Sequence, residues 1–290
     1  LKNNINIYSI GNPGELTYPI KLIDGNSETI KKIVEDKHEL SNKVKNSKKP
    51  IVIIGQSVLK IKSGKYIFEE VKNFLYKNDK INDKWNSLNI LSNNASTVGS
   101  YDLDIFSSNN GDNYTLEKLK NNNFDVLFLF GQDNLAFKKN NEFIVYIGTH
   151  GDKGAEIADI ILPGAAYTEQ EGHYTNLEGI IQKAYKASYP PGEAKEDWKI
   201  INDLAESIIG KKLFKDKEEL DSSLLNYLNL ENEKKSSRKD SVVDNLVFNN
   251  EQIKLNNIDY YYSNVIARSS KTMFNCRNEK FKLKSTGTEG

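Results

Sequence analysis

The sequence predicts an α/β protein with a mostly parallel sheet flanked by helices. Two observations support this fold class. Four short apolar runs are each bounded by glycine or proline, and helical patterns lie between and after them. Alternation of strand and helix is typical of open α/β sheets. With 290 residues, the chain is long enough to bury a sizeable core.

The predicted strands are continuous apolar runs rather than alternating ones. They are Ile51 to Ile54 before Gly55, Val126 to Phe130 before Gly131, Phe143 to Ile147 before Gly148, and Ile157 to Leu162 before Pro163. Continuous hydrophobicity is expected for strands covered on both faces, as in a parallel sheet. We therefore expect other elements to cover both sides of these strands.

Helices are predicted where apolar residues recur at helical spacing. The first has Ile67, Phe68, Val71, Phe74 and Leu75 on one face, and a shorter one has Leu116 and Leu119 after a cap at Thr115. A third has acidic residues in its first turn, ends at Gly210, and carries a stripe of Trp198, Ile201, Leu204, Ala205 and Ile208. A fourth places Leu220, Leu224, Tyr227 and Leu228 together, and a β-like segment runs from Gly179 to Ala184.

A polar stretch near the end of the chain indicates a boundary. Residues 231–240 read ENEKKSSRKD, without an apolar side chain, which indicates a solvated linker or loop. We expect a body over residues 1–228, a linker over 229–257 and a tail over 258–290. The spacing of Tyr262, Ile266, Ser269, Met273 and Cys276 predicts one docking helix in the tail, capped by Ser263 and anchored by Ile266 and Met273.

The composition excludes several functions. The 40 basic and 40 acidic side chains cancel, so no net field attracts nucleic acid or an anionic membrane. No apolar stretch approaches the roughly 20 residues that span a bilayer. One cysteine and three separated histidines cannot form an iron-sulfur cluster or a structural zinc site within the chain. Leu1 at the start and a single methionine, Met273, indicate a processed chain, a fragment or part of a longer one.

Arginine is rare, with 37 lysines against Arg238, Arg268 and Arg277. Lysine cannot reproduce the planar two-point contact that arginine makes with a carboxylate or phosphate. The three arginines are therefore candidates for specific contacts.

One glycine-rich loop follows a predicted strand. The loop from Gly148 through Thr149, His150, Gly151, Asp152 and Lys153 to Gly154 could bring backbone N–H groups close to a phosphate. Its spacing differs from the dinucleotide-binding fingerprint, and a lone glycine loop is a weak signal. We favour a strand-to-helix turn whose glycines adopt positive φ angles.

The titratable and nucleophilic side chains form no recognisable site. His150, His173 and Asp152 suit metal binding or proton transfer by type, but the 22 residues between the histidines show no ligand spacing, so turn or surface positions are favoured. Glu169, Glu171 and Glu178 are expected to be solvated or capping residues. Ser96, Ser100 and Cys276 have no nearby base in the sequence. We predict no catalytic residue, no cofactor-binding residue and no metal ligand.

A long segment after the third predicted strand resembles a known family. Residues 158–163 read ADIILP and residues 174–179 read YTNLEG, elements that recur through the molybdopterin oxidoreductase superfamily. Between them, residues 164–169 read GAAYTE, which is more characteristic of the large iron-sulfur subunit of respiratory complex I, NADH:ubiquinone oxidoreductase. Residues 49–55, 190–201 and 266–276 also resemble that branch. The resemblance covers roughly the whole chain and is weakest in the lysine-rich linker.

The resemblance implies the C-terminal part of the molybdopterin-oxidoreductase-like domain of the 75 kDa subunit family, whose metal site is degenerate. It implies a structural, non-catalytic portion of the complex I peripheral arm, where iron-sulfur clusters carry electrons from NADH to ubiquinone. The clusters are expected in the N-terminal part of the subunit or in a separate partner chain. Other peripheral-arm subunits are the expected partners, and the expected location is the matrix side of the mitochondrial inner membrane.

Two other functions remain open. One is a fragment of an active molybdopterin-dependent oxidoreductase, with the glycine loops at residues 131 and 148–154 holding a pterin dinucleotide. The other is a soluble nucleotide-binding module unrelated to respiration. We expect the isolated chain to be colourless and without NADH dehydrogenase activity. We also expect an obligate partner chain that completes a sheet or core around Ile51 and Val126.

Overall fold

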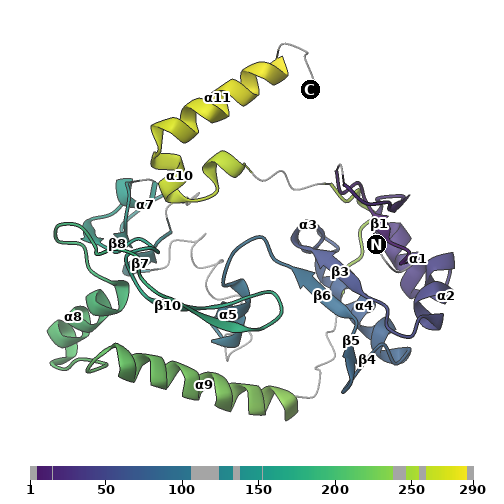
Figure 1. The fold of residues 1–290 in the computed structure, drawn as a ribbon, viewed down its shortest axis with the longest axis horizontal. Helices are drawn as coiled ribbons and strands as arrows, with labels where there is room; N and C mark the ends of the chain where they lie inside the picture. Colours follow the sequence, from purple (N-terminus) through teal and green to yellow (C-terminus); the bar gives the residue numbers. More distant parts are fainter. Residues whose placement is uncertain are drawn as a thin grey trace. The chain divides into compact units, whose positions relative to one another are not determined.

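The computed structural model describes residues 5–14, 16–105, 124–132, 138–151, 153–237, 246–254 and 259–285. The chain divides into two compact units, and each is described by itself (Figure 1). Unit 1 comprises Leu1–Val98 and Arg238–Asn257, and unit 2 comprises Gly99–Ser237 and Ile258–Gly290. The chain therefore crosses between the units three times.

Over its described residues, unit 1 contains short paired strands and four helices. Strands β1 (Tyr8–Ile10) and β2 (Lys21–Ile23) pair in parallel, as do β3 (Val52–Gly55) and β6 (Leu88–Leu91), while β4 (Ile81–Asn82) and β5 (Trp85–Asn86) form an antiparallel pair. The helices are α1 (Ser27–Val34), α2 (Glu39–Asn46), α3 (Gln56–Leu59) and α4 (Gly64–Lys77).

The core of unit 1 lies between α1, α4 and one face of β3. The predicted helix around Ile67 and Leu75 is confirmed as α4, and both side chains are buried, as are Ile30 of α1 and Ile54 of β3. The first strand prediction is also confirmed, but its expected burial on both faces is wrong. Ile53, on the opposite face of β3 from Ile54, is 63% exposed, because the core helices cover only one side of this two-stranded pair.

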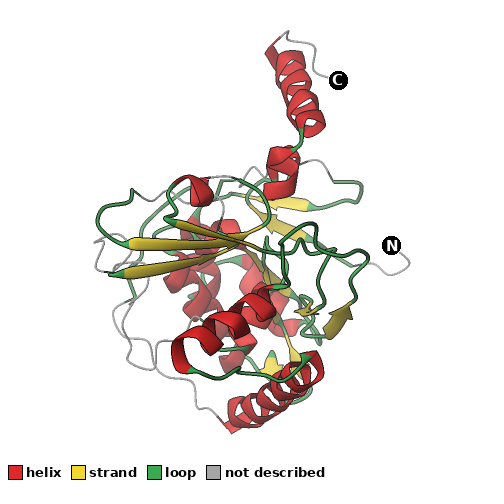
Figure 2. Ribbon diagram, turned by 90° about the vertical axis from the view of Figure 1, so that its left-hand side faces the viewer, coloured by secondary structure: helices red, strands yellow, loops and turns green. Residues whose placement is uncertain are grey.

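Unit 2 is built around a parallel sheet in the order β7-β8-β9. Its strands are β7 (Val126–Phe130), β8 (Phe143–Gly148) and β9 (Ile160–Pro163), and an antiparallel hairpin follows with β10 (Gly172–Thr175) and β11 (Ile181–Ala184). Figure 2 shows the helices in red and the strands in yellow. The helical elements are α5 (Thr97–Asp102), which starts at the unit boundary, α7 (Lys153–Glu156), α8 (Asp197–Ile209), α9 (Lys217–Ser237), η1 (Tyr260–Tyr262), α10 (Val265–Ser269) and α11 (Lys271–Ser285).

Strand β8 is the centre of the unit 2 core. Ile144, Tyr146 and Ile147 are almost completely buried, and Ile144 and Tyr146 pack with Leu129 against the segment around Ala155 and Ile157. Parallel pairing of β7, β8 and β9 confirms the predicted α/β class. The last predicted strand starts later than expected, at Ile160, because residues 157–159 form the connection from α7. The helix predicted around Leu116 and Leu119 lies outside the described residues.

Helix α8 differs from its prediction in the face it buries. Its end at Gly210 is confirmed by a left-handed φ of 74°. Ile208, however, is 73% exposed, while Asn202 is buried. The helix buries Ile200 together with Asn202, whose side-chain oxygen accepts the backbone N–H groups of Leu213 and Phe214.

The linker expected over residues 229–257 also differs from the structure, although the chain does pass from unit 1 to unit 2 after Asn257. Helix α9 continues to Ser237, because Glu and Lys are good helix formers and a polar run need not end a helix. Residues 246–254 form an extended segment on unit 1, so they are not a solvated linker. We call residues 246–254 the strap.

The single tail helix predicted around Ile266 and Met273 is wrong. Ser270 is extended, with φ −84° and ψ 119°, and separates α10 from α11. Its hydroxyl accepts the Met273 N–H, so this serine caps a new helix instead of continuing the first. Asn264, not Ser263, caps α10 by accepting the Ala267 N–H.

Candidate functional site

The glycine-rich loop lies at the carboxyl ends of β8 and β9, where ligands bind in many α/β proteins. Gly164, at the end of β9, donates its N–H to the Gly148 carbonyl over 2.9 Å. The hydroxyl of Tyr146 donates to the His150 carbonyl over 3.1 Å. Helix α7 is only four residues long. The loop is thus held by bonds within the chain.

The glycines of this loop are needed for space rather than for positive φ. A Cβ at Gly148 would lie 2.1 Å from the Tyr146 hydroxyl oxygen, and a Cβ at Gly154 would lie 3.1 Å from the same ring. Neither glycine has a positive φ, so the expected reason for them is wrong although the turn itself is present. The Tyr146 ring therefore gives these glycines a steric role that requires no bound ligand.

Asp197 is a carboxyl group near this edge whose pKa is raised. It opens α8, and its Oδ2 accepts a 3.3 Å hydrogen bond from the Gln170 amide. Burial raises the pKa of Asp197 more than this hydrogen bond lowers it. Gln170 also accepts the Asp197 N–H and donates to the Ala165 carbonyl, so the amide ties α8 to the strand ends. This geometry explains a rigid connection, not a reaction.

The two candidate histidines have separate local partners. The His150 ring contacts the Thr149 hydroxyl at 2.8 Å, and His173 of β10 lies 3.7 Å from Asp221 of α9. Asp152 lies outside the described residues. Within the described parts of the chain, no group of three or more His, Cys, Asp or Glu side chains is arranged to hold a metal ion.

The carboxylates singled out in the sequence serve turns and ion pairs. Glu169 accepts the Ala166 N–H over 2.9 Å, as a capping residue does. Glu171 pairs with Lys183, and Glu178 is exposed. The nucleophile candidates are similarly unsupported, because Cys276 is exposed on α11 and Ser96 and Ser100 lie just before and within α5.

Of the three arginines, Arg277 makes the specific contacts expected of a planar cation. Its Nε pairs with Asp259 at 2.6 Å, and its guanidinium lies 4.7 Å from the Tyr262 ring centre and 4.6 Å from that of Phe281. Arg268 donates to the Tyr262 carbonyl, and Arg238 lies outside the described residues.

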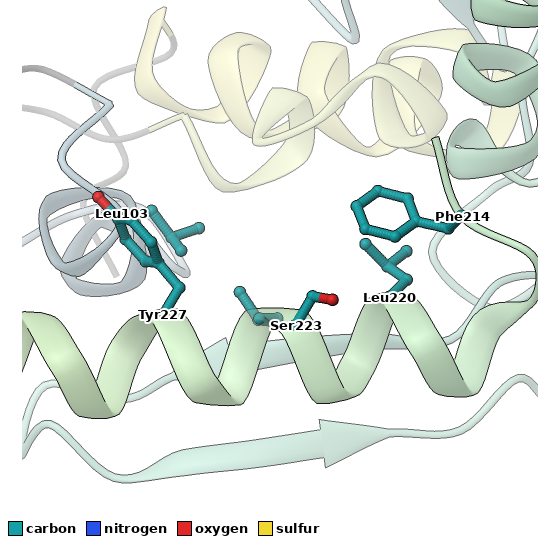
Figure 3. Close-up of a pocket in the computed structure, with 6 residues that line it drawn as sticks. Leu103, Phe214, Leu220, Ser223 and Tyr227 are labelled. Carbon is teal, nitrogen blue, oxygen red and sulfur yellow. The ribbon is translucent and has the colours of Figure 1, made fainter. Parts of the chain in front are cut away.

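An apolar pocket of about 420 Å³ lies along α9 (Figure 3). Leu220, Ser223 and Tyr227 line it from the helix, and Leu103 and Phe214 come from two other segments of unit 2. The polar groups of its lining are the hydroxyls of Ser223 and Tyr227. None of the lining residues carries a carboxylate, an amine or an imidazole. The pocket therefore lacks groups for acid-base chemistry.

The most unusual surface of unit 2 is one face of its parallel sheet. By strand register, Val126, Phe128 and Phe130 of β7 share this face with Phe143, Val145 and Ile147 of β8 and Ile160 of β9. Val145 and Ile147 are buried, whereas the other five side chains are exposed, and the Phe128 and Phe130 rings stack 6.3 Å apart. We call these five exposed residues the open face. Parallel sheets are normally covered on both sides, so the open face is suited to burial against another structure.

The signal for the open face was present in the sequence. A continuous apolar run such as Val126 to Phe130 predicts burial on both faces, but it cannot say which face the same chain covers. Leu129 is buried under the segment around Ala155 and Ile157, while Phe128 and Phe130 are not. Together with the open side of β3, the geometry shows exposed apolar surfaces and no catalytic cluster among the described residues.

The chain belongs to the molybdopterin oxidoreductase family, whose model matches residues 1–207. It is 39% identical over 95% of its length to the NADH-ubiquinone oxidoreductase 75 kDa subunit of Reclinomonas americana, and the match covers 41% of that protein. It is 35% identical over 98% of its length to the G subunit of NADH-quinone oxidoreductase from Rickettsia bellii, covering 41% of it. A mitochondrial 78 kDa subunit of NADH-ubiquinone oxidoreductase from Candida albicans is 33% identical over 95% of the chain, covering 39% of that protein.

These matches confirm the resemblance stated from the sequence, including the branch within the family. The chain spans about two fifths of the length of the curated relatives that it matches. Among the described residues, no helix has the length and apolar character needed to span a membrane.

Proposed function

We propose that this chain is a structural, non-catalytic part of the large iron-sulfur subunit of NADH:ubiquinone oxidoreductase. Its relatives carry the names of that subunit, and the chain corresponds to about two fifths of each. In this proposal the iron-sulfur clusters that carry electrons from NADH to ubiquinone are held outside this chain. Its single cysteine supports that assignment, because a cluster normally needs four thiolates.

The open face is the observation that carries the structural role. Five apolar side chains on one face of a parallel sheet are exposed in this chain alone. In the proposal, the remainder of the large subunit covers this face, whether it is supplied by a separate chain or by the same polypeptide. The assembly lies in the peripheral arm on the matrix side of the mitochondrial inner membrane and also contacts other subunits of the complex.

The test compares two pairs of aromatic substitutions in the chain expressed with its natural partners. Phe128→Asp with Phe130→Asp changes the open face, and Tyr185→Asp with Tyr189→Asp changes two aromatic residues of unit 2 that are more exposed and lie beyond the sheet. Burying one phenylalanine contributes about 1.5–3 kcal/mol, so the open-face pair should weaken assembly by at least about a hundredfold. Co-migration with NADH dehydrogenase activity on native gels is the measurement.

We expect the Tyr variant to co-migrate with the activity and the open-face variant to be lost from it. Because Phe128 and Phe130 are exposed in the chain alone, the isolated variant should unfold at nearly the same temperature as the parent. Normal co-migration of the open-face variant would contradict the structural role. Stoichiometric molybdenum in the purified assembly would instead support the fragment of an active molybdopterin enzyme.

A further inference from the structure

The strap lies on unit 1 as an extended chain (yellow-green near α1 in Figure 1). It pairs with the segment before α1 through an antiparallel bridge between Asn26 and Gln252. The Ser27 N–H donates to the Glu251 carbonyl over 2.9 Å, and the Ile253 N–H donates to the Gly25 carbonyl over 2.7 Å. The strap therefore adds to unit 1 as a short extra strand, more than 200 residues away in the sequence.

Two completely buried serines bind the strap backbone from the starts of two helices. The Ser63 hydroxyl donates to the Asn249 carbonyl over 2.7 Å and accepts the Asn249 N–H over 2.8 Å. The Ser27 hydroxyl donates to the same carbonyl over 2.9 Å and accepts the Glu251 N–H over 2.8 Å. Ser63 occupies the N-cap position of α4 but makes no capping bond with its side chain. Its hydroxyl is committed to the strap instead.

Three strap side chains add selectivity to these backbone contacts. The Phe248 ring lies 5.1 Å from the Tyr66 ring and beneath the ammonium of Lys31. Ile253 packs against the unit 1 core, and the Glu251 carboxylate accepts the Ser63 N–H over 3.2 Å. The intervening side chains of Asn250 and Gln252 are exposed. The contact pattern is thus aromatic at 248, acidic at 251 and aliphatic at 253.

The space for Ile253 depends on close approach of two backbone segments. A Cβ at Gly25 would lie 2.8 Å from the Gly11 Cα, and a Cβ at Gly11 would lie 3.4 Å from the Ile253 side chain. Gly11 also has a φ of 91°, which favours glycine. Unit 1 therefore holds an extended chain through two serines that bind its backbone and through side-chain contacts at both ends.

We propose that unit 1 carries a groove for an extended peptide and that the strap is its exchangeable occupant. The peptides that fit have an aromatic residue, an acidic residue three positions later and an aliphatic residue two positions after that. Such strand addition is a common way to bind a peptide, because main-chain bonds give affinity and alternate side chains give specificity. The chain passes between the two units once before the strap and once after it. If the strap leaves unit 1, the chain segment after Val98 is the one connection that remains between the units.

The test uses the full chain and a fluorescein-labelled synthetic peptide of residues 246–254. Three proteins are compared: the parent, a strap variant with Phe248→Ala and Ile253→Ala, and a control with Val247→Ala and Asn250→Ala, whose side chains are exposed. In the parent, the tethered strap competes at a high effective concentration. The strap variant should therefore bind the peptide roughly tenfold more tightly than the parent or the control, as measured by fluorescence anisotropy.

A peptide carrying the same Phe→Ala and Ile→Ala changes should bind weakly to all three proteins. Equal affinity of the natural peptide for the parent and a folded strap variant would overturn the proposal, as would equal binding of both peptides. If the strap variant fails to fold, hydrogen exchange of the isotope-labelled parent decides the matter. Excess unlabelled peptide should speed exchange at the Asn249 and Glu251 amides and leave the Leu75 amide unchanged, and no change at the strap amides would overturn the proposal.

Discussion

Replacing Ser63 with alanine removes a hydroxyl that serves the strap and not its own helix. Without it, the Asn249 N–H loses its acceptor, whereas the Asn249 carbonyl keeps the hydrogen bond from Ser27. One unsatisfied buried donor costs about 1–3 kcal/mol, so Ser63→Ala should lower the free energy of strap opening by that amount. By the same reasoning, Ser27→Ala leaves the Glu251 N–H without its acceptor and should have a similar effect.

The double variant gives a sharper result, because both serines donate to one carbonyl. Only when both are alanine does the Asn249 carbonyl lose both side-chain donors. The double change should therefore exceed the sum of the single changes by about 1 kcal/mol. Hydrogen exchange at the strap amides measures the free energy of strap opening. The matched control is Ser47→Ala at the exposed end of α2, which should change that free energy by less than about 0.5 kcal/mol. Strictly additive serine effects, or single effects as small as the control, would refute the shared-carbonyl argument.

Two further predictions concern charge. Because burial raises the pKa of Asp197, the folded chain binds this proton more tightly than the unfolded chain, and stability is lost as the pH rises from the ordinary carboxyl range through the raised pKa. Asp197→Asn should therefore raise the thermal unfolding midpoint at neutral pH and change it little at pH values below both pKa values; a lower midpoint at neutral pH would contradict this. Arg277→Lys should increase hydrogen exchange in α11, because lysine cannot stack on Tyr262 with a planar group. Equal protection of α11 in the parent and in Arg277→Lys would contradict the role of the stack. The hydrogen bond with Arg277 lowers the pKa of Asp259, so the protection of α11 in the parent should be lost as the pH falls through that lowered pKa.

Local patterns were enough to predict several elements of the two cores. The spacing of Ile67, Val71 and Leu75 predicted α4, and apolar runs identified β3, β7 and β8. Helix α1 was missed, although Asn26 is a recognisable cap for a segment with Ile30 and Ile33 on one face. In each case the deciding contacts lie within one or two turns or along one strand.

Contacts between distant residues could not be predicted in this way. The strap has polar Asn249, Asn250 and Glu251 at its centre between short apolar ends, and its bonds go to Ser27 and Ser63. No periodicity marks such a segment, because the hydroxyls that satisfy its backbone lie elsewhere in the sequence. The break at Ser270 was missed for a related reason, since a serine hydroxyl competes with the helix backbone for local hydrogen bonds.

The prediction of no catalytic or ligand-binding residue remains a prediction, and the glycine loop offers the clearest way to test it. If Gly148 serves to accommodate the Tyr146 ring, Gly148→Ala forces its Cβ into a buried side chain that is 1% exposed and held by the His150 carbonyl. Overpacking of this kind costs about 1–3 kcal/mol.

A smaller residue at position 146 should relieve that clash. Tyr146→Leu by itself lowers stability by removing the ring and its hydrogen bond, but Gly148→Ala should cost markedly less in the Tyr146→Leu background than in the parent. Urea unfolding of the four proteins gives the coupling free energy between the two positions. If the glycine instead allows a phosphate to approach, Gly148→Ala should change stability little in either background and should abolish stabilisation by added pyrophosphate. If Gly148 makes room for the Tyr146 ring, the stability changes of the two substitutions cannot be additive. A coupling free energy near zero, together with pyrophosphate stabilisation of the parent, would therefore refute the steric explanation.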